Sequence, residues 1–273
     1  MPSIKIGSPL FIVREQAEKD LLGVLEKIAA IGYDGVEFVG LYGNDPAVLR
    51  RHMDALGLRT ISSHVSITDF LAKPEETLQD YKTLGSEYIT LAVQRDCAVY
   101  GSPEYAALLE SLQALCRLCY DNGITPLYHN HNHEFAASPD YVTAFMDDCA
   151  GAGLCLEPDL GWMAYAGADP VAYLRKYRDR TPVIHMKDIY VEDFSKIGPA
   201  ADHGGRRNDP ETGFFEFRPT GYGIMNFPRL LPLCLACKPK WIIADHDLAY
   251  ERDSFEELDM SYRYVKGLLA LAR

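Results

Sequence analysis

Short apolar segments alternate with longer segments of helical pattern along this 273-residue chain. The apolar segments, predicted to be buried strands, lie at residues 4–6, 35–39, 60–65, 88–93, 124–129, 154–159, 182–187 and 241–245. Between them, apolar residues recur at spacings of three and four, as at Leu21, Val24, Leu25 and Ile28, which is typical of a helix with one buried face. This repetition predicts an α/β fold with a parallel sheet, and eight units favour closure into a (β/α)8 TIM barrel.

The chain is long enough for one barrel, because such domains use about 250 residues. We therefore expect a single domain over residues 1–273. An open doubly wound sheet is the alternative, but residues 7–10, which follow the first expected strand, lack the glycine-rich phosphate fingerprint of that fold. The connection between the seventh and eighth apolar segments is unusually long. We expect its residues 189–240 to form a long loop over the barrel mouth.

Helix starts carry a recurring signal, in which a capping residue is followed directly by proline. It occurs at Asp45-Pro46, Ser102-Pro103, Ser138-Pro139 and Asp169-Pro170. The last helix is expected to open at Ser254, with Glu257 three residues later in the pattern of a capping box. These signals divide the chain into the same repeating units as the apolar segments.

The charge balance excludes one class of partner. With 27 Lys and Arg against 39 Asp and Glu, the formal net charge is −12, so the overall field repels polyanions and nucleic acid is not expected to bind. The sequence has no apolar run of about 20 residues, the length that spans a bilayer, and its first residues lack a signal-peptide core. We expect a cytoplasmic protein without a membrane partner, and a homo-oligomer is compatible with the sequence.

The fifth apolar segment ends at His129, and His131, His133 and Glu134 follow it directly. Side chains on a strand alternate between faces, so His129 and His131 are expected to point the same way. Imidazole is a common ligand for divalent metals and the usual general base near neutral pH. The cluster therefore indicates a reaction site, and the alternative is a polar loop with solvated histidines.

Polar residues also follow the other expected strands, where barrels of this type place their active sites. These residues are Glu37, His64, His129, His131, Asp159, His185, Lys187, Asp188, Asp245, His246 and Asp247. Imidazole and carboxylate ligands suit Mn²⁺, Co²⁺ or Zn²⁺, with Mg²⁺ as a further candidate. One residue from each of strands five to eight gives His129, Asp159, His185 and Asp245 as the expected ligands, with His131 and Glu134 competing for the first place.

Several motifs together give a resemblance to a known family. They are Gly32-Tyr33-Asp34-Gly35-Val36-Glu37, Tyr128-His129-Asn130-His131 with Glu134-Phe135, Asp159-Leu160-Gly161-Trp162, His185-Met186-Lys187-Asp188 and Gly221-Tyr222-Gly223. Over nearly its whole length the chain resembles the sugar phosphate isomerase/epimerase proteins of the xylose-isomerase-like TIM-barrel superfamily. In epimerases of that superfamily Glu, Asp, His and Glu hold the metal, and the two glutamates also move protons. The resemblance matches these positions to His129, Asp159, His185 and Asp245, so both glutamates are replaced here.

The resemblance implies proton transfer next to the carbonyl of a ketose or keto-sugar, with a divalent ion stabilising the negative charge. His131 or Glu134 is then expected to be the base, and Lys187 the acid or oxyanion stabiliser. The residues expected to position the substrate are Glu37, His64, Trp162 and Asp247. The leading expectation is an isomerase or epimerase.

Three alternatives remain open. The same first step followed by loss of a β-substituent gives a lyase or dehydratase, of the inosose dehydratase or 3-keto-glycoside-cleaving type. The apurinic endonucleases of the superfamily need a basic DNA-binding face, which the acidic balance disfavours. A non-catalytic sugar-binding barrel is expected to lack a stoichiometric metal ion. No glycine-rich loop or strand-end cluster of basic residues indicates a phosphate, so we expect an unphosphorylated sugar or cyclitol as substrate.

Overall fold

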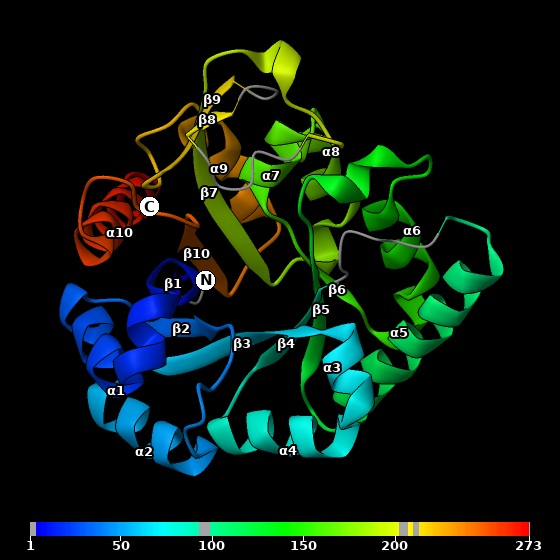
Figure 1. Cartoon of the computed structure of the whole chain (residues 1–273), viewed down its shortest axis with the longest axis horizontal. Coiled ribbons are helices and arrows are strands. Elements are labelled where there is room, and N and C mark those ends of the chain that lie inside the picture. Colours follow the sequence, from blue (N-terminus) through cyan, green and yellow to red (C-terminus); the bar gives the residue numbers. More distant parts are fainter. Residues whose placement is uncertain (1–3, 93–98, 202–206, 210–212, 273) are drawn as a thin grey trace.

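The computed structural model describes residues 4–92, 99–201, 207–209 and 213–272. The strands of its barrel are β1 (Lys5–Pro9), β2 (Gly35–Phe38), β3 (Arg59–Ser66), β4 (Tyr88–Ala92), β5 (Thr125–His129), β6 (Cys155–Glu157), β7 (Val183–Val191) and β10 (Trp241–Asp245). Each overlaps one of the eight apolar segments, so the predicted parallel α/β barrel is confirmed (Figure 1). Val93, expected to end the fourth strand, lies outside the described residues.

The barrel closes between β6 and β7. From β1 to β6, strands that are consecutive in the chain pair in parallel, and β1 also pairs with β10, which pairs with β7. Between β6 and β7 there is an isolated parallel bridge at Asp159 and His185, where the His185 N–H donates to the Pro158 carbonyl oxygen at 3.0 Å. This seam places two of the predicted metal ligands side by side.

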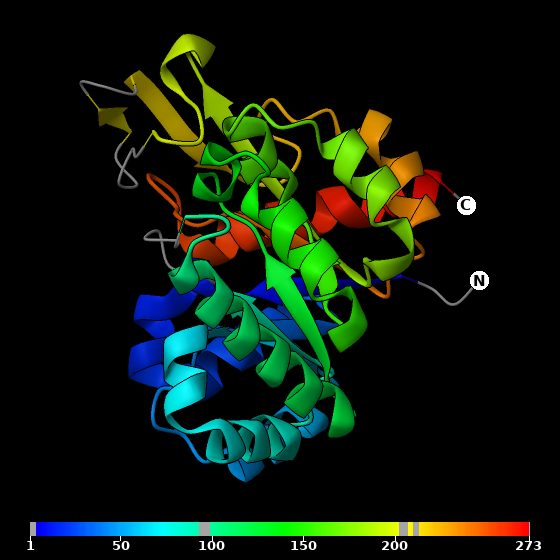
Figure 2. The same ribbon diagram turned by 90° about the vertical axis from the view of Figure 1, so that its right-hand side faces the viewer.

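Helices surround the strands, as views at right angles show (Figure 1, Figure 2). They are α1 (Arg14–Ile31), α2 (Pro46–Leu56), α3 (Ile67–Ala72), α4 (Pro74–Leu84), α5 (Pro103–Asp121), α6 (Tyr141–Asp148), α7 (Leu160–Tyr165), α8 (Pro170–Lys176), α9 (Phe227–Ala236) and α10 (Ser254–Leu271). Among the described residues, none of the helices has both the length and the apolar character needed to cross a membrane.

Three of the four predicted proline-marked helix starts are confirmed, with N-caps at Asp45, Ser102 and Asp169. The prediction at Ser138-Pro139 is wrong, because α6 begins at Tyr141 and the Asp140 carboxylate accepts the Thr143 N–H at 2.8 Å.

The last helix begins at Ser254 as expected, but Asp253 caps it by accepting the Phe255 N–H. The Glu257 carboxylate contacts His246 Nε2 at 3.1 Å instead of completing a capping box.

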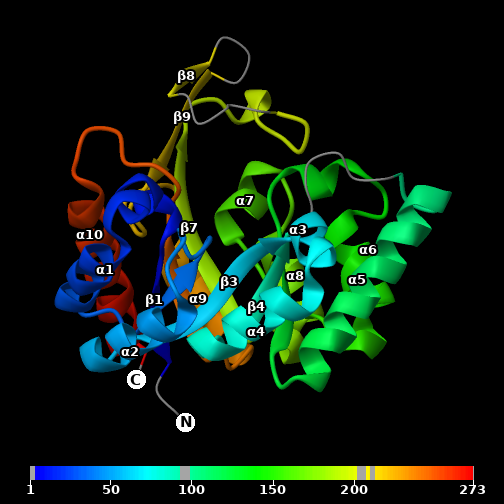
Figure 3. The same cartoon turned by 60° about the horizontal axis from the view of Figure 1, so that its bottom comes forward.

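The stretch expected to be a long loop contains regular structure. β7 continues past the barrel and pairs in antiparallel fashion with β9 (Gly213–Arg218), β9 pairs with β8 (Asn208–Asp209), and α9 follows. The β8–β9 hairpin forms because Phe215 and Phe217, on one face of β9, are buried against Trp162. It rises above the end of the barrel where the strands finish (Figure 3). Residues 202–206 and 210–212 of this stretch lie outside the described residues.

Inside the barrel an apolar layer lies beneath a polar one. The buried apolar layer consists of Ile61, Tyr88, Leu127, Val183, Trp241 and Ile243. Two residues further along three of these strands, the same face carries His129, His185 and Asp245. The polar side chains of the site therefore rest on a buried apolar floor, where electrostatic interactions are strong.

Candidate active site

A pocket of about 260 Å³ lies at the carboxyl ends of the barrel strands. Its lining consists of Pro9, Phe11, Glu37, Val39, His64, His129, His131, His185, Lys187, Asp245 and Asp247. Eight of the eleven predicted site residues belong to this lining. The other three, Glu134, Asp159 and Trp162, are buried beside residues of the lining.

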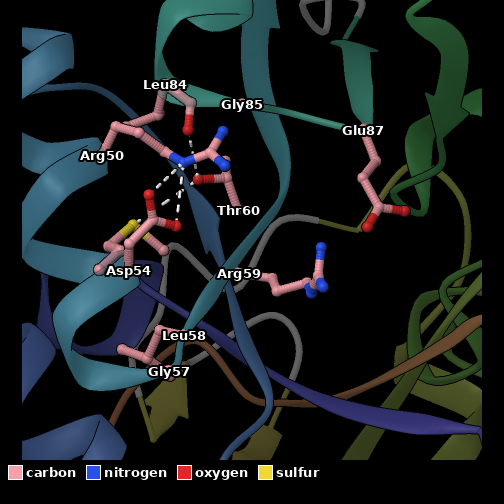
Figure 4. Close-up of a pocket in the computed structure, with 10 residues that line it drawn as sticks. Arg50, Asp54, Gly57, Leu58, Arg59, Thr60, Leu84, Gly85 and Glu87 are labelled. Atoms are coloured by element: carbon pink, nitrogen blue, oxygen red, sulfur yellow. Dashed lines mark hydrogen bonds and ion pairs between the residues drawn. The ribbon is translucent and has the colours of Figure 1, made fainter.

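A second hollow, of about 310 Å³, lies at the other end of the barrel, where α2 leads into β3 and α4 leads toward β4 (Figure 4). There Arg50 Nε lies 3.0 Å and 2.9 Å from the two carboxylate oxygens of Asp54, and both side chains are about half exposed. The amino ends of barrel strands serve stability in this fold, whereas reactions take place at the carboxyl ends. The pocket at the carboxyl ends is therefore the candidate active site.

One side of the site is built around an ammonium group. Lys187 Nζ lies 2.9 Å from Asp159 Oδ2 and 3.0 Å from Asp245 Oδ2, and it also lies 3.0 Å from Asp247 Oδ1. Burial would lower the pKa of Lys187, but the three carboxylates outweigh burial and hold that pKa well above its ordinary value. Burial raises the pKa of Asp159 to about 6. Lys187 is therefore protonated at neutral pH, and its ammonium lies between two of the predicted metal ligands.

Two imidazoles and two carboxylates form the other side. His185 Nε2 lies 2.9 Å from Glu37 Oε2 and 3.5 Å from Glu157 Oε1. His64 Nε2 lies 3.2 Å from the same Glu37 oxygen and 3.5 Å from Glu157 Oε2. Burial opposes the charge on these groups, yet their mutual attraction outweighs it. The pKa of Glu37 is held well below its ordinary value, while that of His185 is raised well above and that of His64 rises to about 10.

The site as a whole has the composition of a cation-binding centre. Five carboxylates gather here: Asp159, Asp245 and Asp247 face the Lys187 ammonium, and Glu37 and Glu157 face the imidazoles of His64 and His185. In addition, His64 Nε2, His185 Nε2 and Glu157 Oε1 are buried without a hydrogen bond of acceptable geometry. Buried polar atoms of this kind are normally satisfied, so their convergence fits a divalent ion with nitrogen and oxygen ligands.

Among the described residues, three groups of His, Asp and Glu side chains bring their donor atoms within 4.8 Å of one another. One contains His64, His129, Glu157 and His185, another contains Asp159, His185 and Asp245, and the third contains His131, His133 and Glu134. The four predicted ligands are thus divided between the first two groups. His185 is the residue that these two groups share.

Glu134 lies behind His131 and not in the pocket lining. Its buried carboxylate accepts the His131 backbone N–H at 2.9 Å and the Tyr128 hydroxyl at 3.2 Å. His131 Nδ1 lies 3.7 Å from Glu134 Oε1, and His133 Nδ1 lies 3.4 Å from Glu134 Oε2. The carboxylate therefore faces one ring nitrogen of His131, whose side chain is 36% exposed.

Hydrogen bonds between the Asn130 side chain and the Asp159 backbone hold the ends of β5 and β6 together. The Asn130 side chain donates to the Asp159 carbonyl oxygen at 3.2 Å and accepts the Asp159 N–H at 3.0 Å. Asp159 Oδ1 in turn caps α7 by accepting the Trp162 N–H at 2.8 Å. The start of α7 lies so close to β7 that a Cβ atom at Gly161 would be 2.7 Å from the Lys187 carbonyl oxygen. Lys187 and Asp159 are thereby fixed relative to each other.

The Trp162 indole lies near both proton-transfer candidates. Its ring centroid is 6.1 Å from that of His131, and Lys187 Nζ is 5.3 Å from it. Trp162 is 7% exposed and packs in the aromatic cluster with Phe215 and Phe217. His131 and Lys187 are therefore within about 6 Å of one rigid ring.

Sequence reasoning missed Glu157, which contacts both His64 and His185. It lies in the sixth apolar segment, two residues before Asp159, so strand alternation was a signal that both carboxylates share one face. The apolar part of the lining, including Phe11 and Val39, was also missed. These two residues carried no chemical signal in the sequence.

Among curated proteins, the chain is similar to the inosose dehydratase of Clostridium beijerinckii, with 27% identity over 63% of this chain and 65% of that protein. It is also similar to the inosose dehydratase of Geobacillus kaustophilus, with 23% identity over 61% of each chain. The chain thus spans less than two thirds of the length of these relatives.

Known structures share the fold. A sugar phosphate isomerase/epimerase from Parabacteroides distasonis matches with a TM-score of 0.75 and 19% identity, over 97% of this chain and 98% of that one. A probable 3-DHS dehydratase from Bacillus anthracis matches with a TM-score of 0.74 and 14% identity, over 96% and 99% of the two chains. The family model described as xylose isomerase-like TIM barrel matches residues 25–243. The protein therefore belongs to the xylose isomerase-like TIM barrel family.

Proposed function

We propose that this protein is a divalent-metal-dependent dehydratase that removes a proton from the carbon next to the carbonyl of an unphosphorylated keto-cyclitol or keto-sugar. The neighbouring β-hydroxyl then leaves as water. One observation carries the proposal: a single pocket combines a cation-binding cluster around His185 with a partly exposed imidazole, His131, and a protonated amine, Lys187.

The cation is proposed to bind beside His185, the residue common to two groups of converging donors. When bound, a divalent ion polarises a carbonyl and its neighbouring hydroxyl, which lowers the cost of removing the adjacent proton. The excess of carboxylates in this pocket supports such a role, because the pocket favours a positively charged occupant.

His131 is proposed as the base. Its side chain is partly exposed in the pocket lining, and its Nδ1 faces the buried carboxylate of Glu134. That carboxylate favours the tautomer with a proton on Nδ1, which leaves Nε2 able to accept a proton from the substrate. Glu134 is then a positioning residue, because its carboxylate is buried and hydrogen-bonded to Tyr128 and to the His131 backbone.

Lys187 is proposed as the acid. Its raised pKa keeps it protonated, so it can give a proton to a departing hydroxyl or stabilise negative charge on the former carbonyl oxygen. His131 as base and Lys187 as acid suit the removal of a proton together with the loss of a hydroxyl. The similar proteins named inosose dehydratases favour this elimination over the isomerase or epimerase reaction that the sequence pattern led us to expect first.

The substrate class is inferred from the lining and the relatives. Among the described lining residues, Lys187 is the sole Lys or Arg, and three carboxylates already surround it, so no basic cluster awaits a phosphate. The similar proteins from C. beijerinckii and G. kaustophilus are named inosose dehydratases, which supports a keto-cyclitol.

The test is incubation of the purified, Mn²⁺-loaded protein with an inosose in D₂O, followed by NMR. We expect an unsaturated product formed by loss of water. Deuterium in recovered substrate without elimination would replace the dehydratase with an isomerase or epimerase. No exchange and no product with several keto-cyclitols and keto-sugars would refute proton removal itself.

His131→Ala and His52→Ala provide a matched pair for this assay. His131 lines the pocket, whereas His52 lies on α2 near Glu26, away from it. We expect the reaction to be lost in the first variant and retained in the second. Equal activity of the two variants would remove His131 from the proposed mechanism.

A further inference from the structure

We propose that the divalent cation of this pocket is held by Glu37, His64, Glu157 and His185, and not by the set His129, Asp159, His185 and Asp245 that the sequence pattern favours. This inference rests on the proposed function only in assuming that a divalent ion binds. It assigns Glu157 a role as ligand and moves Asp159 and Asp245 to supporting positions. In the group of His64, His129, Glu157 and His185 it replaces His129 with Glu37, whose Oε2 lies 2.9 Å from His185 Nε2 and 3.2 Å from His64 Nε2.

The donor atoms of these four residues lie close enough together to share one cation. His185 Nε2 and His64 Nε2 lie 2.9 and 3.2 Å from Glu37 Oε2, and each lies 3.5 Å from an oxygen of Glu157. Ligands at the usual 2.0–2.2 Å from a tetrahedral Zn²⁺ are about 3.4 Å apart. Both Nε2 atoms are buried and form no hydrogen bond of acceptable geometry, so each can bind a cation once the cation has displaced its proton.

The two carboxylates are already oriented for this role. The Ser62 hydroxyl donates to Glu37 Oε1, which leaves Oε2 facing the imidazoles. The Thr90 hydroxyl donates to Glu157 Oε2 at 2.8 Å, and Glu157 Oε1 is buried without a hydrogen bond. Metal-binding carboxylates are typically held in this way by outer hydrogen bonds.

His185 has the arrangement of a metal-bound histidine. Its Nδ1 lies 2.9 Å from Asp245 Oδ2, while its Nε2 points to Glu37 and Glu157. A histidine that binds metal through one nitrogen almost always donates its other N–H to a carboxylate or carbonyl oxygen. Asp245 therefore supports His185 from behind and does not need to reach the cation.

The Lys187 ammonium lies between Asp159 and Asp245, two ligands of the set that the sequence pattern favours. It lies 2.9 Å from Asp159 Oδ2 and 3.0 Å from Asp245 Oδ2, at the point where a cation shared by these carboxylates would have to bind. The other oxygen of Asp159 accepts the Trp162 N–H. A metal ion there would have to displace the ammonium and would meet its repulsion.

Glu157→Gln and Asp159→Asn give a matched test. Each replaces a carboxylate with an amide of the same shape, and the two residues lie two positions apart at the end of β6. We would measure the metal content of both variants after dialysis against Zn²⁺, and their Zn²⁺ affinity by competition with a chromophoric chelator. We expect Glu157→Gln to bind Zn²⁺ at least 100-fold more weakly than the wild type. We expect Asp159→Asn to remain within about 10-fold, as a residue outside the ligand set.

Thr90→Ala is a second variant, which tests the role of Glu157 even if Glu157→Gln fails to fold. It removes only the hydroxyl that donates to the Glu157 carboxylate. Its Zn²⁺ affinity should fall about 10-fold, the effect typical of an outer hydrogen-bond partner. Loss of Zn²⁺ from folded Asp159→Asn, or unchanged affinity in Glu157→Gln or Thr90→Ala, would overturn the assignment. Absence of Zn²⁺ binding by the wild type would instead refute the metal dependence of the proposed function.

Discussion

Replacing Lys187 with methionine should strongly destabilise the metal-free protein. The side chain is 2% exposed, and its ammonium lies within 3.0 Å of oxygens of Asp159, Asp245 and Asp247. Methionine keeps the unbranched chain but removes the charge, so three carboxylates lose the cation that compensates them. Removing one partner of a buried ion pair typically costs about 3–5 kcal/mol.

This loss corresponds to a large shift in thermal unfolding. For a chain of this length, 1 kcal/mol shifts the midpoint Tm by about 2–4 °C, so a loss of about 3–5 kcal/mol should lower the Tm of the variant by roughly 6–20 °C. The assay is thermal unfolding followed by circular dichroism in the presence of EDTA, so that bound metal does not contribute.

Lys176→Met is the matched control. Lys176 Nζ lies 2.9 Å from Asp147 Oδ2, the same distance as in the Lys187–Asp159 pair, but both partners are about half exposed. An exposed pair contributes about 0–1 kcal/mol, so this variant should melt within about 4 °C of the wild type. Equal shifts in the two variants would refute the argument that burial makes the Lys187 cluster essential.

Three further outcomes are expected. His131→Ala should reduce activity by roughly 10²–10⁴-fold at unchanged Zn²⁺ content, and a loss of Zn²⁺ would make His131 a ligand instead of a base. Burial would lower the pKa of His64, but Glu37 and Glu157 raise it to about 10. The proton on His64 therefore stabilises the metal-free protein fully below about pH 6.5, and this stabilisation is lost as the pH rises through 10. Zn²⁺ binding at pH 8 should therefore release protons, and a calorimetric enthalpy independent of the buffer would contradict this. Asn132 donates to the carbonyl oxygens of Gly198, Pro199 and Ala201, so Asn132→Ala should speed amide hydrogen exchange around residues 197–201, and unchanged exchange would show that this contact does not hold the segment.

The fold was predictable because strand–helix alternation is a local property of the sequence. All eight barrel strands overlap the apolar segments, and the caps at Asp45, Ser102 and Asp169 begin helices as expected. The β8–β9 hairpin was not predicted, because its packing depends on contacts between β9 and Trp162 that are remote in sequence. Ser138 was mistaken for a cap because Asp140, two residues later, competes for the same helix.

The site was predictable in its residue types and only partly in its contacts. Parallel strands end at the same edge, so the polar residues that follow them were expected to meet, and eight of them line one pocket. Which donor atoms face one another depends on how deeply each residue lies in the barrel and on the length of its side chain, and the order of residues in the sequence does not give this. Glu157 was read as part of an apolar strand, yet it contacts His64 and His185, while Lys187 lies between Asp159 and Asp245.

The metal content of the purified protein tests the account most directly. His185 belongs to both groups of converging donors beside the pocket, so elemental analysis should find about one divalent ion per chain in the wild type and almost none in folded His185→Ala. A wild type that retains no ion after dialysis against Mn²⁺, Co²⁺ or Zn²⁺, or a His185→Ala variant with the full wild-type content, would contradict the account.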